Sequence, residues 1–516
     1  MPRQRKGLSA FFIFAFLTAA GLWPLPAWSQ SAQQDDEDRL LETREEQTES
    51  AGESNGLRGR LEPEQEESGR SQRPRRAGEE ILRQSDSPDT LPTSRTDPLN
   101  PINPDVARNS LLSRNPDNLQ NPLLDTREDL PRDRDREEDP YAALGIRLGS
   151  FLLFPELSAE TVYDDNIFLS GTNQEGDWAL ALTPGLRIDS DWSRHSLSAT
   201  LSGERNYHDR FSTEDEKTFS AGVTGQLDIL RNTNLVATAN YSQFLEDRSS
   251  TDFPANASER PKTHNRDASL EGNHTFNRVT LTLRGETAEE DFSDSTAVDG
   301  SLINNDDRDF TERRVTGRVA YEFQPGVSAF VESSANERDF KQPIDDDGTA
   351  NGSSGHDIQG GLSFLLTGKL TGEASAGYAI QNPDDASLGD VDGLIFNSAL
   401  EWRATGLTTV RLDASSEVAE TTNTGSAGSI VRAAEISVEH RPRRHIILGA
   451  SLGYELETFS GSDQEDKEWA AGLTGEYIIT RSVALTLDYE HLKSWSNVPG
   501  SDYTTDEVRF GVRVRR

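Results

Sequence analysis

The chain has 516 residues, a formal net charge of −37, a hydrophobic fraction of 33% and no cysteine. An acidic excess of this size argues against nucleic acid as a partner, because a phosphate backbone needs a basic surface. Without cysteine there can be no disulfide, thiol chemistry or cysteine-ligated metal. After the first thirty residues no run of eighteen apolar residues occurs, so a membrane-spanning helix is not expected.

Residues 1–29 have the three parts of a secretory signal peptide. Arg3, Arg5 and Lys6 precede a long apolar run, and Ala27-Trp28-Ser29 provides a small-x-small cleavage site. The sequence therefore predicts that the mature chain leaves the cytoplasm.

Residues 30–140 are rich in Glu, Asp, Arg, Ser, Gln and Pro and contain very few aromatic residues. Such a composition cannot bury enough apolar surface to offset the entropy of ordering the chain. We expect a disordered acidic, Arg- and Pro-rich periplasmic segment. A folded plug would have a similar length, but nothing in this segment could form its core.

From Tyr141 to the last residue the chain alternates between apolar and polar residues with a period of two, as strands do. In the hairpin 468–492, Leu473 and Tyr477 share one face, while Thr474 and Glu476 share the other. Each arm is long enough for the roughly 9–11 residues that a tilted strand needs to cross a bilayer. A soluble sandwich strand would alternate in the same way, so one hairpin does not decide between the two.

This pattern predicts about eighteen strands, an even number as single-chain bacterial barrels require. They are expected near 151–163, 177–189, 195–207, 217–229, 234–246, 266–276, 278–290, 308–322, 326–339, 355–367, 369–381, 391–404, 407–419, 430–441, 444–458, 467–479, 481–494 and 503–516.

The connections between these strands alternate between short and long. Short ones include 231–233, 324–326 and 405–406; the long ones, rich in Asp, Asn, Ser and Gly, include 247–265, 291–307, 340–354 and 382–390. Outer-membrane barrels have short periplasmic turns and long outer loops, whereas propellers and Greek-key sandwiches do not alternate strictly. We predict an all-β fold: a transmembrane up-and-down antiparallel β-barrel over residues 141–516, in the cell outer membrane with both chain ends in the periplasm.

The polar face of each strand should point into the barrel. A one-residue slip would put charges against lipid, at a cost of about 2–4 kcal/mol for each Arg or Lys near the midplane. For any single inward charge, a solvated wall residue or part of a cross-strand ion pair is favoured over a specific role in the pore. The residues predicted to line the lumen are Glu271, Arg284, Glu286, Arg318, Glu322, Glu373, Glu401, Arg403, Arg411, Asp413, Glu435, Glu476, Asp488, Arg509 and Arg513, together with Glu204, Glu332, Glu439, Glu455 and Glu490.

Sequence motifs for catalysis are not found. The histidines show no HExxH pairing, and there is no GxSxG elbow or phosphate-binding glycine loop. The run Asp345-Asp346-Asp347-Gly348 lacks the distal Glu of a calcium loop, so a solvated acidic loop is favoured. We expect no enzyme activity, cofactor or metal, although a hydrolase site assembled at the barrel rim would leave no local motif.

The stretch from Asp139 to Leu201 resembles the opening of a family of outer-membrane β-barrel porins from Gram-negative bacteria. The residues that carry the resemblance are Asp139-Pro140-Tyr141, Gly145, Gly149, Tyr163-Asp164-Asp165-Asn166, Pro184-Gly185 and Asp191-Trp192-Ser193-Arg194-His195. The resemblance implies an outer-membrane pore, and some members of that family are linked to exopolysaccharide secretion. The chain departs from barrel sequences at its end, which is Arg516 and not an aromatic residue.

Three functions are therefore open: a passive or weakly selective pore, which could belong to an exopolysaccharide export system; an outer-membrane hydrolase; and a structural barrel that presents its tail to periplasmic partners. Expected partners are the lipid bilayer, lipopolysaccharide, the barrel-assembly machinery and, for the export role, polysaccharide-export components. Conductance would separate the first function from the others.

Overall fold

The computed structural model describes residues 140–516 except 251, 255, 346, 347, 367, 368, 420 and 422–425. The predicted signal peptide and all but the last residue of the predicted periplasmic segment lie outside the described residues.

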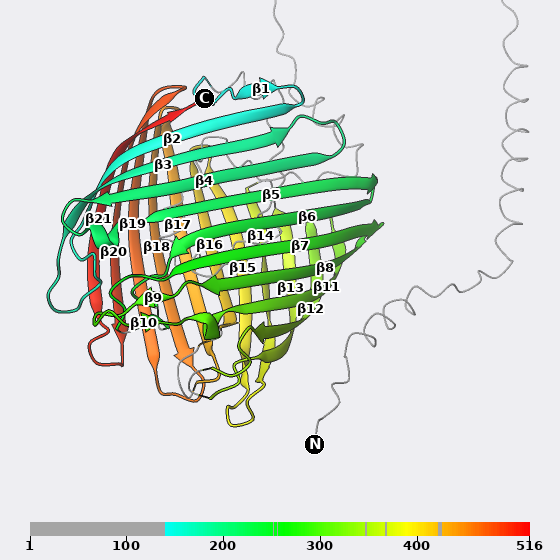
Figure 1. Ribbon diagram of the computed structural model, residues 1–516. Helices are drawn as coiled ribbons and strands as arrows, with labels where there is room; N and C mark the ends of the chain where they lie inside the picture. The colour runs from blue at the N-terminus through cyan, green and yellow to red at the C-terminus, as the bar shows by residue number, and fades with distance from the viewer. Residues whose placement is uncertain are drawn as a thin grey trace, which may run out of the picture. The chain divides into compact units, whose positions relative to one another are not determined.

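Within the described residues, eighteen antiparallel strands close into one barrel, which confirms the predicted fold (Figure 1). The strands are β2 (Phe151–Asp164), β3 (Asp177–Ser190), β4 (Ser196–His208), β5 (Lys217–Leu230), β6 (Thr233–Leu245), β7 (Lys262–Phe276), β8 (Val279–Phe292), β11 (Phe310–Gln324), β12 (Val327–Phe340), β13 (Ser353–Leu366), β14 (Leu370–Pro383), β15 (Val391–Thr405), β16 (Thr408–Ala419), β17 (Ser429–Arg443), β18 (Ile446–Phe459), β19 (Glu465–Thr480), β20 (Val483–Ser496) and β21 (Tyr503–Arg515).

The barrel closes because β2 has a partner on each edge. It pairs with β3 along its whole length and with β21 from Glu156 to Asp164. A short strand that the sequence did not predict, β1 (Ile146–Leu148), pairs with Phe151–Leu153. Since β21 pairs only with the later part of β2, β1 continues the ladder beyond the end of the chain. At the seam β2 is therefore paired on both edges, with β3 on one and with β1 and β21 on the other.

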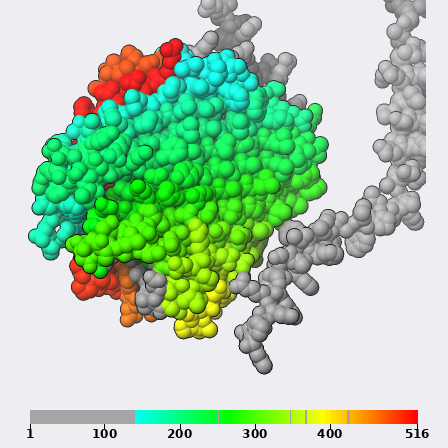
Figure 2. Space-filling view, viewed as in Figure 1, coloured from blue at the N-terminus to red at the C-terminus, as the bar shows by residue number. Residues whose placement is uncertain are grey.

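Side-chain exposure alternates along the strands, as the sequence pattern predicts. In β19 and β20, Leu473 and Leu487 are 56% and 52% exposed, whereas Thr486 and Ile478 on the opposite face are 4% and 2% exposed. Side chains inside a closed barrel crowd one another and those outside do not, so the crowded face is the inner one. Figure 2 shows the cyan-to-green strands as a continuous wall. Among the described residues, no helix is long and apolar enough to cross a membrane.

Short turns join the strands at one end of the barrel, and longer loops join them at the other. Three short turns are Arg231-Asn232, Asn277-Arg278 and Arg481-Ser482, and five of the turns follow a register shift in the preceding strand. Such bulges take up the extra residue that a tight hairpin needs. Asn277 supplies the left-handed backbone in its turn, with φ of 56°.

The long loops differ in two places from the prediction. Strand β7 begins at Lys262 and not at 266, so the loop before it spans 246–261. The polar residues 262–265 concealed this start, because their alternation contains no large apolar residue. The loop between β8 and β11 is partly ordered, since it contains the short hairpin of β9 (Ser295–Thr296) and β10 (Leu302–Ile303).

Candidate pore lining

The inner face carries every charged residue that the sequence placed in the lumen. Each of these residues has the strand parity of the crowded face, opposite the exposed leucines, valines and aromatic residues of the same strand. That they line a conducting pore remains a proposal. Glu322 has a more local role, because its carboxylate accepts a hydrogen bond from the Gly326 N–H in the adjacent turn, at 3.1 Å.

One set of ion pairs runs along the wall formed by β7 and β8. Glu271 and Arg284 are direct cross-strand partners, and the Arg284 Nε donates to the Glu271 carboxylate at 2.8 Å. Glu286, two residues along β8, lies 3.5 Å from the same guanidinium. Asn273 donates to the second Glu271 oxygen at 2.6 Å. The carboxylate of Glu271 is therefore held in place by one donor from its own strand and one from β8.

A longer contact joins β11 to β14 across the two strands between them. The Arg318 guanidinium donates to Glu373 at 2.8 Å, lies 3.6 Å from Glu332 and stacks 3.5 Å above the ring centroid of Phe330. The path is open because Gly361 of β13 has no side chain: a Cβ there would lie 2.4 Å from the Phe330 ring. The glycine thus lets the ring lie flat beneath the guanidinium.

The wall formed by β15, β16 and β17 combines an ion-pair cluster with a pair of like charges. Glu401 accepts from Arg403 at 3.1 Å and from its cross-strand partner Arg411 at 3.3 Å. Beside this cluster, Asp413 and Glu435 are direct partners in the β16–β17 ladder. Two carboxylates in that position repel each other.

Around the barrel seam the inner charges come from strands far apart in sequence. Arg509 donates to Glu507 at 2.6 Å and lies 3.5 Å from Glu204 of β4. Nearer the short-turn end, Arg513 donates to Glu476 at 2.9 Å. Asp488 is the cross-strand partner of Arg509.

Every arginine of the predicted lumen set contacts a carboxylate. The pairs are Arg284–Glu271, Arg318–Glu373, Arg403–Glu401, Arg411–Glu401, Arg509–Glu507 and Arg513–Glu476. The carboxylates of the set outnumber its arginines, so the net charge of the predicted lumen set is negative. A wet wall of that sign favours cations.

Several buried charges were missed by the sequence reasoning, and they cluster at the loop end. The Arg338 Nη2 donates to Glu312 at 2.6 Å, with both side chains less than a tenth exposed. Glu246 accepts two hydrogen bonds from Arg308. Burial alone would lower the pKa of Arg308, but the Glu246 carboxylate raises it overall. Arg308 follows no strand alternation because it lies in a loop, and its position could not be read from periodicity.

The histidines have local structural partners. His195 accepts a hydrogen bond from the Asp228 N–H, His264 contacts the Tyr241 hydroxyl and His440 contacts Thr408. Asp346 and Asp347 of the acidic run considered for cation binding lie outside the described residues; in the described part of the chain no three His, Asp or Glu residues are grouped as metal ligands.

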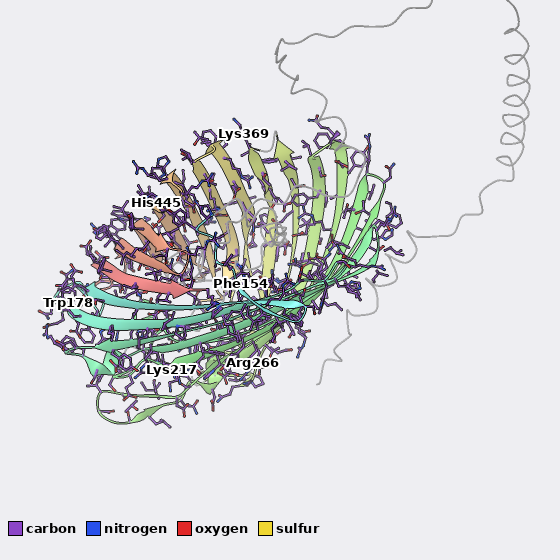
Figure 3. All side chains as sticks on the ribbon, turned by 90° about the horizontal axis from the view of Figure 1, so that it is seen from above. Phe154, Trp178, Lys217, Arg266, Lys369 and His445 are labelled. Atoms are coloured by element: carbon purple, nitrogen blue, oxygen red, sulfur yellow. The ribbon has the colours of Figure 1, made fainter. Side chains whose placement is uncertain are left out.

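The outer face carries a band of exposed leucine and valine bordered by aromatic residues. Trp178, Tyr207 and Phe219 are exposed toward the loop end, and Phe276 and Trp402 toward the short turns. Figure 3 shows Trp178 at the edge of the barrel. Aromatic girdles of this kind mark the two membrane interfaces of a transmembrane barrel.

A family model described as "Putative beta-barrel porin 2" matches residues 139–516. The chain belongs to this family. The match covers the whole barrel and begins at Asp139-Pro140-Tyr141, where the resemblance in the sequence begins. As a member of this porin family, the barrel lies in the outer membrane.

Solved structures that match the chain include three from Pseudomonas aeruginosa. OccK2 (OpdF) is 11% identical over 71% of this chain and 98% of its own, with a TM-score of 0.38; OpdL is 14% identical over 72% and 99%, with a TM-score of 0.37. The siderophore receptor PirA is 8% identical over 70% and 80%, with a TM-score of 0.35. Similarity at this level says nothing about what passes through the barrel. No curated protein matches the sequence.

Proposed function

We propose that this porin-family barrel is a passive pore for small solutes, with a modest preference for cations. The observation that carries the proposal is the charge of the predicted lumen set, in which each arginine contacts a carboxylate and the carboxylates outnumber the arginines. Barrels of about 16–18 strands are wide enough to leave an aqueous channel. Small neutral solutes are selected by size alone, whereas charged solutes also interact electrostatically with the charged wall.

A part in exopolysaccharide export is the second function to test, and it rests on the family resemblance alone. It makes a different demand on the barrel, because a polymer needs a wide and continuous passage. The hydrolase and scaffold alternatives need no ion flow at all.

Single-channel recording in a planar bilayer tests the proposal. Refolded protein that shows heat-modifiable migration should give stable conductance steps in KCl. Folded protein that inserts but never conducts, either as the full mature chain or without residues 30–136, contradicts the pore and leaves the hydrolase and scaffold functions.

A further inference from the structure

One hydrogen bond joins two walls of the barrel that are far apart in strand order. The Thr421 hydroxyl donates to the Asp252 carboxylate at 2.8 Å. Asp252 lies in the loop from β6 to β7, and Thr421 in the loop from β16 to β17. Around the barrel, β8 and β11–β15 separate the two loops on one side, while β2–β5 and β18–β21 separate them on the other. The contact therefore links nearly opposite sides of the mouth.

The β6–β7 loop supplies more of the connecting chain than the β16–β17 loop does. Thr421 follows the end of β16 at Ala419 by two residues, which keeps it within about 7 Å of its own wall. Asp252 is seven residues beyond the end of β6 at Leu245, for which about 25 Å is the upper bound, and hydrogen bonds from the Ser250 N–H to the Asp247 carbonyl and from the Phe253 N–H to the Ser250 carbonyl shorten the reach. We call the described residues of this loop, 246–250, 252–254 and 256–261, the strap.

Two ion pairs, one buried and one partly buried, hold the base of the strap. Glu246 accepts from the Arg308 Nη1 at 3.0 Å and from Nη2 at 2.5 Å, and Arg308 stacks 4.0 Å above the Phe292 ring. Arg248 donates to both oxygens of Glu214, at 2.7 and 3.2 Å. Bidentate pairs of this kind fix the orientation of both side chains, so the strap leaves the wall in a defined direction.

Neighbouring loops support the strap along its length. Ala257 forms a β-bridge with Ala297, and the Ser258 N–H donates to the Thr296 carbonyl at 2.8 Å. Both Ala257 and Ala297 are buried. The strap is therefore joined to the β9–β10 hairpin as well as to the walls, unlike a loop that extends freely into solvent.

Aromatic side chains from further loops pack against the same base. The Arg248 guanidinium lies 5.6 Å from the ring centroids of both Phe168 and Phe253, and Phe168 meets Phe211 edge to face at 5.0 Å. Loops that begin after β2, β4, β6 and β8 thus form one packed group. The hydrogen bond that the Thr421 hydroxyl donates to Asp252 connects this group to the far wall.

We propose that the strap crosses the outer mouth, is fastened to the opposite wall by Asp252 and Thr421, and sets the size limit of the pore. This inference rests on the proposed pore function for its consequence, although the position of the strap can be tested without it. While the contact is made, the mouth is divided and only small solutes pass. A polymer could pass only after the strap is released.

The position is tested by cross-linking. The chain has no cysteine, so the double variant Asp252→Cys with Thr421→Cys contains a unique thiol pair. In folded protein, mild oxidation or a short bis-thiol reagent should join the two thiols in most molecules and change their electrophoretic mobility. The control pair combines Asp252→Cys with Ser387→Cys in the β14–β15 loop, and it should stay uncross-linked. If both thiols of the Asp252→Cys with Thr421→Cys variant react with a thiol reagent but do not cross-link to each other, the proposed position of the strap is contradicted.

The function of the strap is tested by removing the hydrogen bond that fastens it to the opposite wall. Asp252→Ala with Thr421→Val should raise the swelling rate of proteoliposomes in a tetrasaccharide several-fold, while the rate in glucose changes less than twofold. The cross-linked double-cysteine protein should keep the exclusion limit of the unaltered chain. An unchanged limit after release contradicts the proposal that the strap sets it. If neither the unaltered chain nor the Asp252→Ala with Thr421→Val variant passes any sugar or ion, the proposed pore function is contradicted. The cross-linking result still tests the position of the strap in that case.

Discussion

At the scale of single residues, the inner wall depends on where side chains are absent. Gly361 lies under the Phe330 ring, and that ring carries the Arg318 guanidinium on its way to Glu373. The sequence predicted Arg318 and Glu373 as lumen residues, because each follows the alternation of its own strand. It could not predict that they meet, since periodicity assigns a face but does not identify a partner three strands away.

Replacing Gly361 tests this arrangement. A Cβ at Gly361 would lie 2.4 Å from the Phe330 ring and 2.5 Å from the Ala374 carbonyl, so Gly361→Ala must displace the ring or the backbone. Overpacking of this kind costs about 1–3 kcal/mol. We expect a lower unfolding midpoint in urea titrations of the refolded barrel. Gly285→Ala is the control, because a Cβ there meets nothing within 4 Å, and equal midpoints for the two variants would contradict the packing described.

At the scale of elements, the long strands were predictable and the short ones were not. Each of the eighteen barrel strands overlaps a predicted strand, although β7 begins four residues earlier than predicted, because every strand must keep one face toward lipid. The strands β1, β9 and β10 contain two or three residues each, too few to show a period. They form because a neighbouring strand edge or loop pairs with them, and this tertiary contact cannot be read from a local sequence pattern. The strap was unpredictable for the same reason, since Asp252 and Thr421 are 169 residues apart.

The composition of residues 30–140 leads to a prediction about the barrel as a separate unit. Deleting Gln30–Arg136 should leave a detergent-stable, heat-modifiable barrel, because the composition of this segment cannot form a core, and Pro140 and Tyr141, which contact the barrel, are kept. The Arg481 Nε donates to the Pro140 carbonyl at 2.6 Å, and Tyr141 packs on Ile478 and Ala484. Loss of refolding after this deletion would mean that the segment is a structural plug.

At the scale of the whole molecule, the division between short turns and long loops predicts the orientation in the membrane. Epitope tags inserted in the long loops at 384–390 or 341–352 should be accessible on intact cells, whereas a tag near Ser71 should become accessible only after the outer membrane is permeabilised. Long loops face outward in barrels of this kind, and both chain ends then lie in the periplasm. Labelling of the Ser71 tag on intact cells would reverse the orientation.

The net charge of the inner wall makes a second prediction at this scale, and it concerns which variants alter ion selectivity. Asp413→Asn with Glu435→Gln removes two facing carboxylates and leaves the ion pairs of Glu401 with Arg403 and Arg411 in place. Glu401→Gln instead removes the carboxylate shared by Arg403 and Arg411. Both changes should lower cation preference, and Glu401→Gln should lower it more for each charge removed. The same direction is expected for Glu373→Gln and Glu476→Gln.

The reversal potential across a bilayer with a KCl gradient tests the central claim most directly, namely that this barrel is a pore whose wall selects by negative charge. The account predicts a cation-selective potential at low salt that shrinks as salt rises toward about 1 M, where the Debye length falls to about 3 Å. It also predicts a smaller potential for Asp413→Asn with Glu435→Gln at the same salt. An anion-selective potential, or one that these variants leave unchanged in protein of verified fold, would contradict the account.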